Sequence, residues 1–445
     1  MAEQAELPPV TEIDSSAGAQ GGDDIVSYGI VPKARAFGLP REPLGDRARR
    51  VFQEWPVNST RLDPGHPWAH IWIAPFLVDV ARLLIWWWQT AGRVSKATGI
   101  ARRFQFFDII RMTWPHRFHG QIYYMFELYR PEEKARRGEY LTRWETKNGL
   151  IRLLRQQFID KSVARSNMRD KVAFTVSLAK HGLPGIPIIA SFDRGKPTPA
   201  EIDPKLLRQD LFTKLRAGKG AQGAGLIRYL GDDRYRYGSR EFDCAGLLQQ
   251  LAKQSERANL ILLPRLTNHP DIAGLAVETL MAVRTFSMIN ERGQPEVVFA
   301  MLRVLGKLEP TWHSRVEWAA AIDLETGELG LLAGDVPEEF TRRYTHHPFT
   351  GYPVQGVILP YWQEVKATAL AVHRQLAMDR FVVGWDIAVT PTGPRVLEGN
   401  VLPDVTFPQR VGHRPFGQTR YGEILHYHLD RVELLLKERA AKAGA

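Results

Sequence analysis

The sequence is poor in cysteine and lacks several common motifs, and each absence narrows what the chain can be. Cys244 is the single cysteine among 445 residues, which excludes an internal disulfide and a four-cysteine zinc site. The N-terminus has no basic segment followed by an apolar run, so it does not resemble a secretory signal and we expect a cytoplasmic protein. The patterns GxxxxGK(S/T) and GxSxG are also missing, which argues against the P-loop and against serine hydrolases of that type.

Long charge-free apolar runs are absent as well. The most apolar stretch, Ile71 to Trp88, is interrupted by Pro75, Asp79 and Arg82, whereas a membrane-spanning helix needs about 20 residues nearly free of charge. We therefore favour a buried helix for this stretch. Attachment to a membrane interface through its tryptophans is the second interpretation, and a true membrane span is the third.

Positive charge is concentrated in one part of the chain. The sequence has 59 Lys and Arg against 49 Asp and Glu, a net charge of +10, and residues 89–170 alone hold 17 basic and 8 acidic residues. Apolar residues recur there at helical spacing, so we predict amphipathic helices with basic faces. These faces are either simply solvated or bind an anionic partner, for example anionic lipid headgroups. The glycine-aromatic signatures of RNA-binding sheets are absent, which argues against nucleic acid.

Beyond residue 170 short apolar runs alternate with helical segments, which indicates mixed helix and sheet. We predict helices at 171–183, 244–258, 361–378 and 425–443, and strands at 186–191, 210–215, 226–230, 260–266, 282–289, 296–305 and 316–323. A hairpin with arms at 382–389 and 394–399 follows, joined by the turn sequence TPTG.

This hairpin carries the most specific chemical signal in the sequence. A turn near TPTG places Asp386 opposite Glu398, and Asn400, two residues further on, faces the same side as Glu398. Their side-chain oxygens suit Mg²⁺, which usually keeps several waters and is completed by nucleotide phosphates. A hairpin whose acids simply face water is the alternative for so short a pattern.

A second signal is a lysine at the end of a strand followed by a glycine-rich loop. Lys214 precedes GKGAQG, residues 218–223. An ammonium group and the backbone N–H groups of such a loop can surround phosphate oxygens. A surface loop without this role is the alternative.

Taken in order along the chain, these features resemble the ATP-grasp superfamily. The resemblance is closest to its sugar-transfer associated branch, through segments such as NHPDIAGL, TLMAVRTFSMI, HHPFTGYPVQGVILPYW and GWDIAVTPTGPRVLEGN. It extends from about Lys171 to Gln409, and the basic helical region before it looks like the N-terminal extension of that branch.

This resemblance implies an α+β, ATP-grasp fold, in which two α+β lobes clasp the nucleotide, with an N-terminal mostly helical extension. It divides the chain into a flexible tail at 1–48 and a basic, Trp-rich helical region at 49–165. A first lobe with the lysine and glycine lid then covers 166–259, and a second lobe with the metal-binding hairpin and the C-terminal helix covers 260–445.

The resemblance also implies which residues bind ATP. The residues that match contacts to the phosphates, including the lid over them, are Lys171, Lys214, Gly218, Lys219, Gly220 and Gly223. The residues that match the hinge meeting adenine through backbone groups are Leu263, Pro264 and Leu266. Arg265 departs from the pattern, because many relatives have an acid there.

For the reaction itself, the resemblance implies catalytic roles for Arg303, Arg284 and Lys214. Arg303 matches the arginine that neutralises charge on the transferred phosphoryl group, and Arg284 lines the same cleft. The Mg²⁺ ligands that it implies are Asp386, Glu398 and Asn400.

We therefore expect an ATP-dependent carboxylate-amine ligase that forms a C–N bond through an acyl phosphate, in polysaccharide, glycoconjugate or related natural-product assembly. Its partners are a small-molecule or sugar-linked carboxylate and an amine. If the second interpretation of residues 71–88 holds, these residues and the basic helices also make peripheral contact with the inner face of the membrane. A kinase-like phosphotransferase and a nucleotide-binding scaffold for a glycosyltransferase complex are the alternatives. The chain departs from the branch at TWHSRVEWAA, which affects acceptor binding near Trp312, His313 and Arg315.

Two adjacent histidines require a separate interpretation. His346 and His347 precede a proline in what we expect to be an ordered loop near the cleft. We favour structural hydrogen bonding, with acceptor contact second and a zinc site third, since further zinc ligands at suitable spacing are missing.

Overall fold

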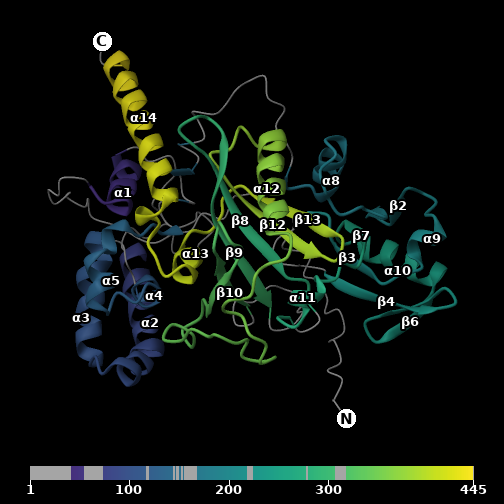
Figure 1. The fold of residues 1–445 in the computed structure, drawn as a ribbon, viewed down its shortest axis with the longest axis horizontal. Helices are drawn as coiled ribbons and strands as arrows, with labels where there is room; N and C mark the ends of the chain where they lie inside the picture. Colours follow the sequence, from purple (N-terminus) through teal and green to yellow (C-terminus); the bar gives the residue numbers. More distant parts are fainter. Residues whose placement is uncertain are drawn as a thin grey trace.

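The computed structural model describes residues 42–54, 74–116, 120–143, 146, 150–151, 154, 168–217, 224–276, 279–305 and 317–443. These residues form a helical N-terminal region and two antiparallel sheets, one in each of the two following parts of the chain (Figure 1). The second sheet lies in the middle of the molecule, between the N-terminal helices and the part that contains the first sheet.

The N-terminal region contains α1 (Leu44–Glu54), α2 (Ala74–Thr98), α3 (Arg102–His116), α4 (Gly120–Met125) and α5 (Pro131–Ala135). On α2, Leu83, Ala91 and Val94 are buried in a core shared with α3 and α4. Of the stretch 71–88, side chains are described from Val80 onward; Leu83 is buried whereas Leu84, Ile85 and Trp88 are exposed, so in this part the predicted buried helix is confirmed for one face only. Within the described residues, no helix is both long and apolar enough to span a membrane.

The first sheet has the strand order β2-β1-β7-β3-β4-β5-β6. Its strands are β1 (Ala190–Asp193), β2 (Lys196–Thr198), β3 (Leu211–Leu215), β4 (Gly225–Gly231), β5 (Arg234–Tyr237), β6 (Arg240–Asp243) and β7 (Leu260–Pro264). The short helix α9 (Pro204–Leu207) precedes β3. Helix α10 (Cys244–Ser255) begins at Asp243, whose side chain accepts a hydrogen bond from the Gly246 N–H, and it buries Leu247 and Leu251 against the sheet.

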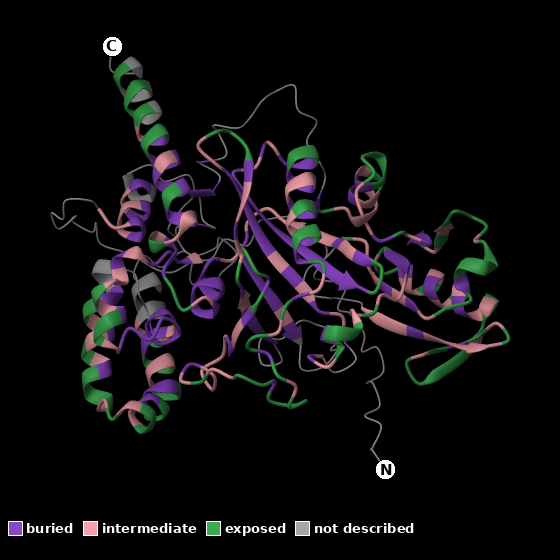
Figure 2. Ribbon diagram, in the orientation of Figure 1, coloured by how far each residue is buried: buried purple, intermediate pink, exposed green. Residues whose placement is uncertain are grey.

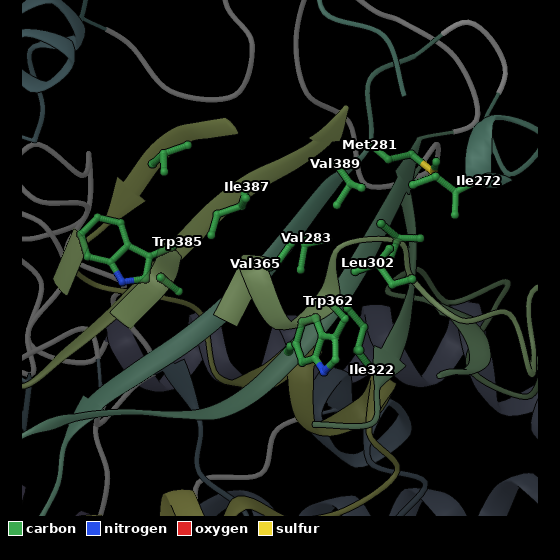
Figure 3. Packing of buried hydrophobic residues seen from close by; sticks show 14 of the residues in the cluster. Ile272, Met281, Val283, Leu302, Ile322, Trp362, Val365, Trp385, Ile387 and Val389 are labelled. Carbon is green, nitrogen blue, oxygen red and sulfur yellow. The ribbon is translucent and has the colours of Figure 1, made fainter. Parts of the chain in front are cut away.

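The second sheet has the order β11-β10-β9-β8-β12-β13. Its strands are β8 (Ala282–Ile289), β9 (Pro295–Leu305), β10 (Glu317–Ile322), β11 (Leu329–Gly334), β12 (Val382–Thr390) and β13 (Gly393–Asn400). Helix α12 (Trp362–Leu376) packs on one face, where Figure 3 shows Val365 close to Val283 and Trp362 close to Ile322 of the strands. Strands β8 to β11 also contact α13 (Thr406–Val411) or α14 (Arg420–Ala443).

Alternation along the strands of the second sheet separates apolar from charged side chains. Val283, Leu302 and Ile387 belong to the core under α12, and each is adjacent in sequence to a charged residue. Because successive side chains of a strand point to opposite faces, those charged residues lie on the face away from α12. Figure 2 shows how thoroughly the strands at the centre of this sheet are buried.

Helix α8 (Lys171–Lys180) connects the two sheets. Phe174 stacks on Trp385 of β12 at a centroid distance of 6.4 Å, and Phe174 and Leu178 join the core of the second sheet. The chain then continues through Pro184, whose carbonyl accepts a hydrogen bond from the Val396 N–H of β13 at 2.8 Å. The hairpin is therefore held by α8 as well as by its own sheet.

The structure corrects two of the predicted elements. The predicted strand 186–191 is wrong over most of its length, because β1 begins only at Ala190 and Ile186 packs in a cluster between the two sheets. The N-terminal boundary also differs, since α1 begins at Leu44, inside the segment predicted as a tail, with Leu44 and Ala48 fully buried. The rest of that predicted tail, 1–41, lies outside the described residues.

Candidate nucleotide and metal site

The charged face of the second sheet centres on an ion pair between two neighbouring strands. Asp386 of β12 is opposite Arg284 of β8, and the guanidinium donates from Nε to Oδ1 at 2.7 Å and from Nη2 to Oδ2 at 2.6 Å. Asp386 is 3% exposed, so this fork-shaped pair is nearly withdrawn from water. Burial alone raises the pKa of Asp386, but Arg284 and Arg303 outweigh it and hold the pKa below its ordinary value.

Arg303 of β9 extends this pair into a row across the sheet. Its Nη1 donates to Asp386 Oδ2 at 3.2 Å and its Nε donates to Glu317 Oε1 of β10 at 2.5 Å. Burial lowers the pKa of Arg303, but Glu317 and Asp386 more than reverse this and raise it above its ordinary value. The guanidinium therefore stays charged, and two carboxylates fix its orientation.

The predicted hairpin is confirmed, including its register. Asp386 pairs with Glu398 across β12 and β13, and the turn lies between Thr390 and Gly393. The register shifts next to Asp386, where Ile387 pairs with Val396, so Leu397 is an additional residue in β13. Asn400 donates from Nδ2 to Glu398 Oε1 at 3.5 Å, and both side chains are half-buried.

Two lysines approach the same carboxylates from the other part of the chain. Lys214 lies on β3 of the first sheet, and burial and the neighbouring Lys171 lower the pKa of Lys214 to about 8 although Glu398 and Asp386 oppose this shift. Burial likewise lowers the pKa of Lys171, against the attraction of Glu398 and Asp170. Both ammonium groups therefore share the field of Glu398, as a phosphate site between two lobes requires.

The position of Lys171 follows from the start of α8. Asp170 caps this helix by accepting from the Val172 and Ala173 N–H groups at 2.9 and 3.2 Å, and it also accepts from Arg216 Nη2 at 2.8 Å. Arg216 follows directly after β3. This ion pair therefore holds the first turn of α8, with Lys171, against the end of the strand that carries Lys214.

The predicted hinge residues lie at the end of β7 and just beyond it. Leu263 is buried, Pro264 and Leu266 are half-buried, and Leu263 and Leu266 share an apolar cluster with Leu397 of the hairpin. Arg265 donates from Nη1 to Asp210 Oδ2 at 2.9 Å. The arginine that departs from the pattern of the resemblance is thus engaged in an ion pair beside β3, and the predicted hinge residues Leu263 and Leu266 pack in one cluster with Leu397 of the hairpin.

Several predicted residues fall in parts of the chain that the structure does not describe. These are Gly218, Lys219, Gly220 and Gly223 of the expected lid, and Trp312, His313 and Arg315 of the departing segment. The histidine pair lies inside the described residues. His347 is buried, and its Nδ1 accepts from the Phe349 and Thr350 N–H groups at 3.2 and 3.0 Å, which is the structural role that we favoured.

The donor set suits Mg²⁺ only if a nucleotide completes it. Across the described part of the chain, no group of three or more His, Cys, Asp or Glu side chains is arranged to hold a metal ion. Asp386, Glu398 and Asn400 supply two carboxylates and one amide; Oδ1 of Asp386 retains a lone pair beyond its bond to Arg284, whereas Oδ2 accepts from both Arg284 and Arg303. Mg²⁺ is commonly bound by one or two carboxylates plus substrate phosphates, so this incomplete set fits.

Two members of this site were missed from the sequence. Glu317 orients Arg303, and Asp170 connects α8 to Arg216. Their partners lie 14 and 46 positions away in sequence and on other elements, so no spacing rule identifies them. A carboxylate directly before a helix, as at Asp170, is nevertheless a capping signal.

Comparisons with known proteins agree with this geometry. The family described as sugar-transfer associated ATP-grasp matches residues 155–417, more than half of the chain. No curated protein matches the chain in sequence.

Solved structures that are similar include a D-alanine-D-alanine ligase from Coxiella burnetii, with 11% identity and a TM-score of 0.33 over 62% of both chains. Another is a D-alanine-D-alanine ligase from Bacillus anthracis complexed with ATP, with 11% identity and a TM-score of 0.34 over 61% of this chain and 68% of the other. A third is a biotin carboxylase from Campylobacter jejuni, with 10% identity and a TM-score of 0.36 over 60% of this chain and 46% of the other. The chain thus spans 62% of the first of these proteins, and such partial superpositions place no residue of the site.

Proposed function

Because the chain belongs to the sugar-transfer associated ATP-grasp family, we propose that it is an ATP-dependent ligase that joins a carboxylate to an amine. The α+β fold with a helical N-terminal region agrees with this membership. The observation that carries the proposal is the convergence of charge between the two sheets. Arg284, Arg303 and Asp386 lie on one side, and on the other Lys171 and Lys214 are close enough to Glu398 for its charge to raise their pKa values.

The proposed reaction has two steps. The substrate carboxylate oxygen attacks the γ-phosphorus of ATP, the bond to the β-phosphate oxygen breaks, and ADP leaves. The amine nitrogen then attacks the acyl carbon, phosphate leaves with one oxygen of the original carboxylate, and the nitrogen loses a proton as the amide forms. Positioning and charge neutralisation supply most of the rate in such transfers.

Each described residue of the site has a role in this reaction. Lys214 and Lys171 bind the ATP phosphates, and Leu263, Pro264 and Leu266 line the adenine end. Arg303, held by Glu317, faces the charge that develops on the transferred phosphoryl group, and Arg284 keeps Asp386 ionised and oriented. Asp386, Glu398 and Asn400 would hold Mg²⁺, which offsets phosphate charge when it is bound.

The carboxylate and the amine belong, in this proposal, to polysaccharide, glycoconjugate or related natural-product assembly, as the sugar-transfer association of the family suggests. The remaining lid residues, Gly218, Lys219, Gly220 and Gly223, would close over the phosphates and exclude water from the acyl phosphate. We place the protein in the cytoplasm, peripheral to the inner face of the membrane.

Trapping the intermediate tests this function without knowledge of the natural amine. The chain is incubated with ATP, Mg²⁺, hydroxylamine and a panel of amino acids and uronic acids, and hydroxamate and ADP are measured together. We expect equal amounts of hydroxamate and ADP with one class of carboxylate. When that carboxylate is labelled with ¹⁸O, one labelled oxygen must appear in inorganic phosphate.

The alternatives give other results in the same assay. A phosphorylated hydroxyl compound with ADP, and no hydroxamate, would show a kinase-like phosphotransferase. Saturable ATP binding with no ADP formed from any member of the panel would favour the nucleotide-binding scaffold.

A further inference from the structure

Large apolar side chains are exposed together on one surface of the N-terminal helices. On α2, Leu84, Ile85 and Trp88 are 45%, 52% and 72% exposed, and on α3, Phe104 and Phe107 are 58% and 57% exposed. Residues three or four positions apart lie on the same side of a helix, so Trp88 neighbours both Leu84 and Ile85 on α2, and Phe107 neighbours Phe104 on α3. We call these five residues, with the cations around them, the apolar-basic surface.

The two helices form one continuous surface. Arg102, the first residue of α3, places its guanidinium 5.0 Å from the ring centroid of Trp87 and 5.6 Å from that of Trp88 on α2. Trp87 donates from Nε1 to the Arg102 carbonyl at 3.0 Å and packs edge-on against Phe106. Trp86 and Trp87 are thus partly used in packing, whereas Trp88 remains mostly exposed.

The charge around this surface is positive. Lys96, Arg102, Arg103 and Arg111 are exposed, and no carboxylate among the described residues pairs with them. The one acid with a described side chain on these two helices is Asp108, which is already engaged by the ammonium group of Lys134 and by the Tyr123 hydroxyl. The exposed charge is therefore cationic and not neutralised locally.

The fold of the region does not require this composition. The core of α2 and α3 is built by the opposite faces, from residues such as Leu83, Val94 and Ile109. The other large exposed apolar side chains among the described residues, such as Val176 on α8 and Leu434 on α14, are spread over separate elements. Scattered apolar residues are normal on a surface, but a cluster of this size marks an interaction site.

We propose that the apolar-basic surface binds an anionic membrane surface, with its aromatic and aliphatic side chains at the headgroup level and its cations against lipid phosphates. Exposed tryptophan and phenylalanine surrounded by lysine and arginine is the composition of helices that lie in a membrane interface. A second copy of the chain fits this surface poorly, because it would place the same uncompensated cations opposite one another. Charge complementarity therefore selects an anionic lipid surface.

The position of this surface allows attachment without blocking the nucleotide site. In Figure 1, α2 and α3 lie at one end of the molecule, on the far side of the second sheet from β3 and β7. The site residues Lys214 and Leu263 belong to those two strands. A protein held at the membrane by α2 and α3 would thus keep these two strands away from the lipid surface.

The test is co-sedimentation of the full chain, without ATP, with phosphatidylcholine vesicles that contain or lack phosphatidylglycerol. We expect binding to the anionic vesicles at low salt, weaker binding at high salt, and none to the neutral vesicles. Replacing Phe104 and Phe107 together by Ser, or Arg103 and Arg111 together by Glu, should lower the affinity at least about tenfold. Ile358→Ser, which alters a similarly exposed apolar residue elsewhere, should leave it unchanged.

A second measurement locates the contact. Lipids brominated on their acyl chains quench tryptophan fluorescence only on contact, so anionic vesicles made with such lipids should lower the tryptophan fluorescence of the protein. Trp88→Phe keeps an aromatic ring, so binding should persist while most of that quenching is lost. Thermal unfolding of each variant shows that it is folded.

Three outcomes would overturn the proposal. One is no sedimentation with anionic vesicles at low salt, and another is equal binding of the Phe104/Phe107 variant and the wild-type chain. The third is a dimer in analytical ultracentrifugation that the same variant dissociates, which would make this surface an interface between copies. None of these measurements depends on catalysis, so failure of the proposed ligase activity would be distinguishable.

Discussion

At the scale of single residues, the two carboxylates of the hairpin are held in different ways. Asp386 is almost fully buried between two guanidinium groups, so its charge is part of what keeps the centre of the second sheet together. Glu398 is half-buried and accepts a hydrogen bond from the amide of Asn400 at 3.5 Å. Loss of charge at the two positions should therefore have different consequences.

For Glu398, we predict loss of activity with little loss of stability. Glu398→Gln keeps the shape of the side chain but removes a negative charge beside the proposed Mg²⁺, so turnover should fall by orders of magnitude while the free energy of unfolding is nearly unchanged. ADP release and urea unfolding measure the two effects. Glu364→Gln, on the exposed face of α12, is the matched control. Wild-type turnover in Glu398→Gln would exclude this residue from the metal site.

For Asp386, we predict loss of activity together with loss of stability. Asp386→Ala leaves Arg284 and Arg303 with an uncompensated positive charge in a buried place, and breaking a buried pair in this way costs about 3–5 kcal/mol. Urea unfolding of the single variant, and of a double variant in which Arg284 is also replaced by Met, measures the effect. The double variant should recover part of the lost free energy, and an equal or greater loss would show that the pair is not the cause.

His373 should make stability depend on pH. Trp385 donates from Nε1 to Ser287 Oγ at 2.8 Å, Ser287 Oγ lies 2.6 Å from His373 Nδ1, and His373 Nε2 lies 3.2 Å from the Arg380 carbonyl. This chain of bonds is satisfied by a neutral imidazole that donates from Nε2 and accepts at Nδ1. Burial accordingly lowers the pKa of His373 to about 4 from 6.5.

The direction in which the free energy of unfolding changes with pH follows from proton binding. Between pH 6.5 and about 4 the unfolded chain holds a proton on this histidine that the folded chain does not, so the free energy of unfolding falls as the pH falls through this range. The full effect is about 3 kcal/mol, and no further loss from this group occurs below pH 4. Urea unfolding at several pH values should show a shallower dependence in His373→Gln than in the exposed control His181→Gln. Equal slopes would contradict the assignment.

At the scale of elements, the hairpin shows both what a sequence can predict and what it cannot. The turn residues and the alternation on both arms were sufficient to place Asp386 opposite Glu398. The additional residue Leu397 was not predictable, because it belongs to an apolar cluster with Leu263 and Leu266, which come from the other sheet. Local pattern thus predicts the pairing, whereas contact between lobes decides where the strand bulges.

In the first sheet, too, some strands could be predicted from the sequence and others could not. Strands such as β7 were predicted because they are continuous apolar runs. Strands β5 and β6, RYRY and REFD, were missed because exposed arginines and acids alternate with few apolar residues at the edge of the sheet. Conversely, the apolar run at 186–191 was mistaken for a strand, although its first residues pack between the lobes without pairing.

Gly399 provides a test at the element scale. A Cβ at this position would lie 2.5 Å from the Trp385 ring and 3.0 Å from Met168 Sδ. Gly399→Ala should therefore push β13 away from β12, destabilise the chain by about 1–3 kcal/mol and weaken Mg²⁺-ATP binding, because Glu398 and Asn400 flank the glycine. Gly330→Ala in β11, where the nearest atom would be 3.6 Å away, should change neither quantity. Normal ATP binding in a stably folded Gly399→Ala would contradict this reasoning.

At the scale of the whole molecule, the N-terminal helices and the second sheet form one structure. Leu44, Ala48 and Val51 of α1 share a core with Phe286 and Met288 of β8 and with α14. The sequence indicated helices in this region, but not that they complete the core of the sheet, because apolar periodicity identifies a buried face without identifying what covers it. Apart from the end of the predicted tail, the domain boundaries drawn from the sequence remain a prediction.

A single buried arginine connects these parts most directly. Arg410 of α13 is 1% exposed, and it donates to the carbonyls of Gly334 at the end of β11, Glu339, and Met125 of α4 at 2.7, 2.6 and 3.2 Å. Glu127, 3.4 Å from its Nη1, provides the opposite charge. Burial and Arg343 lower the pKa of Arg410 to about 10 in spite of Glu127.

Replacement of Arg410 should therefore weaken the whole molecule in one step. Arg410→Ala leaves three buried carbonyl groups without their donor and opens a cavity where α4, α13 and the end of β11 meet, so we expect a loss of about 3–5 kcal/mol. Because the N-terminal helices and the second sheet share their cores, the helical signal in circular dichroism and the tryptophan fluorescence should still change in one urea transition. The midpoint of that transition should lie at a lower urea concentration than in the wild-type chain. Arg414→Ala, an exposed arginine nearby in sequence, should leave that transition in place. Two separate transitions in Arg410→Ala would instead mean that the N-terminal helices and the second sheet can unfold independently, and that Arg410 is what couples them.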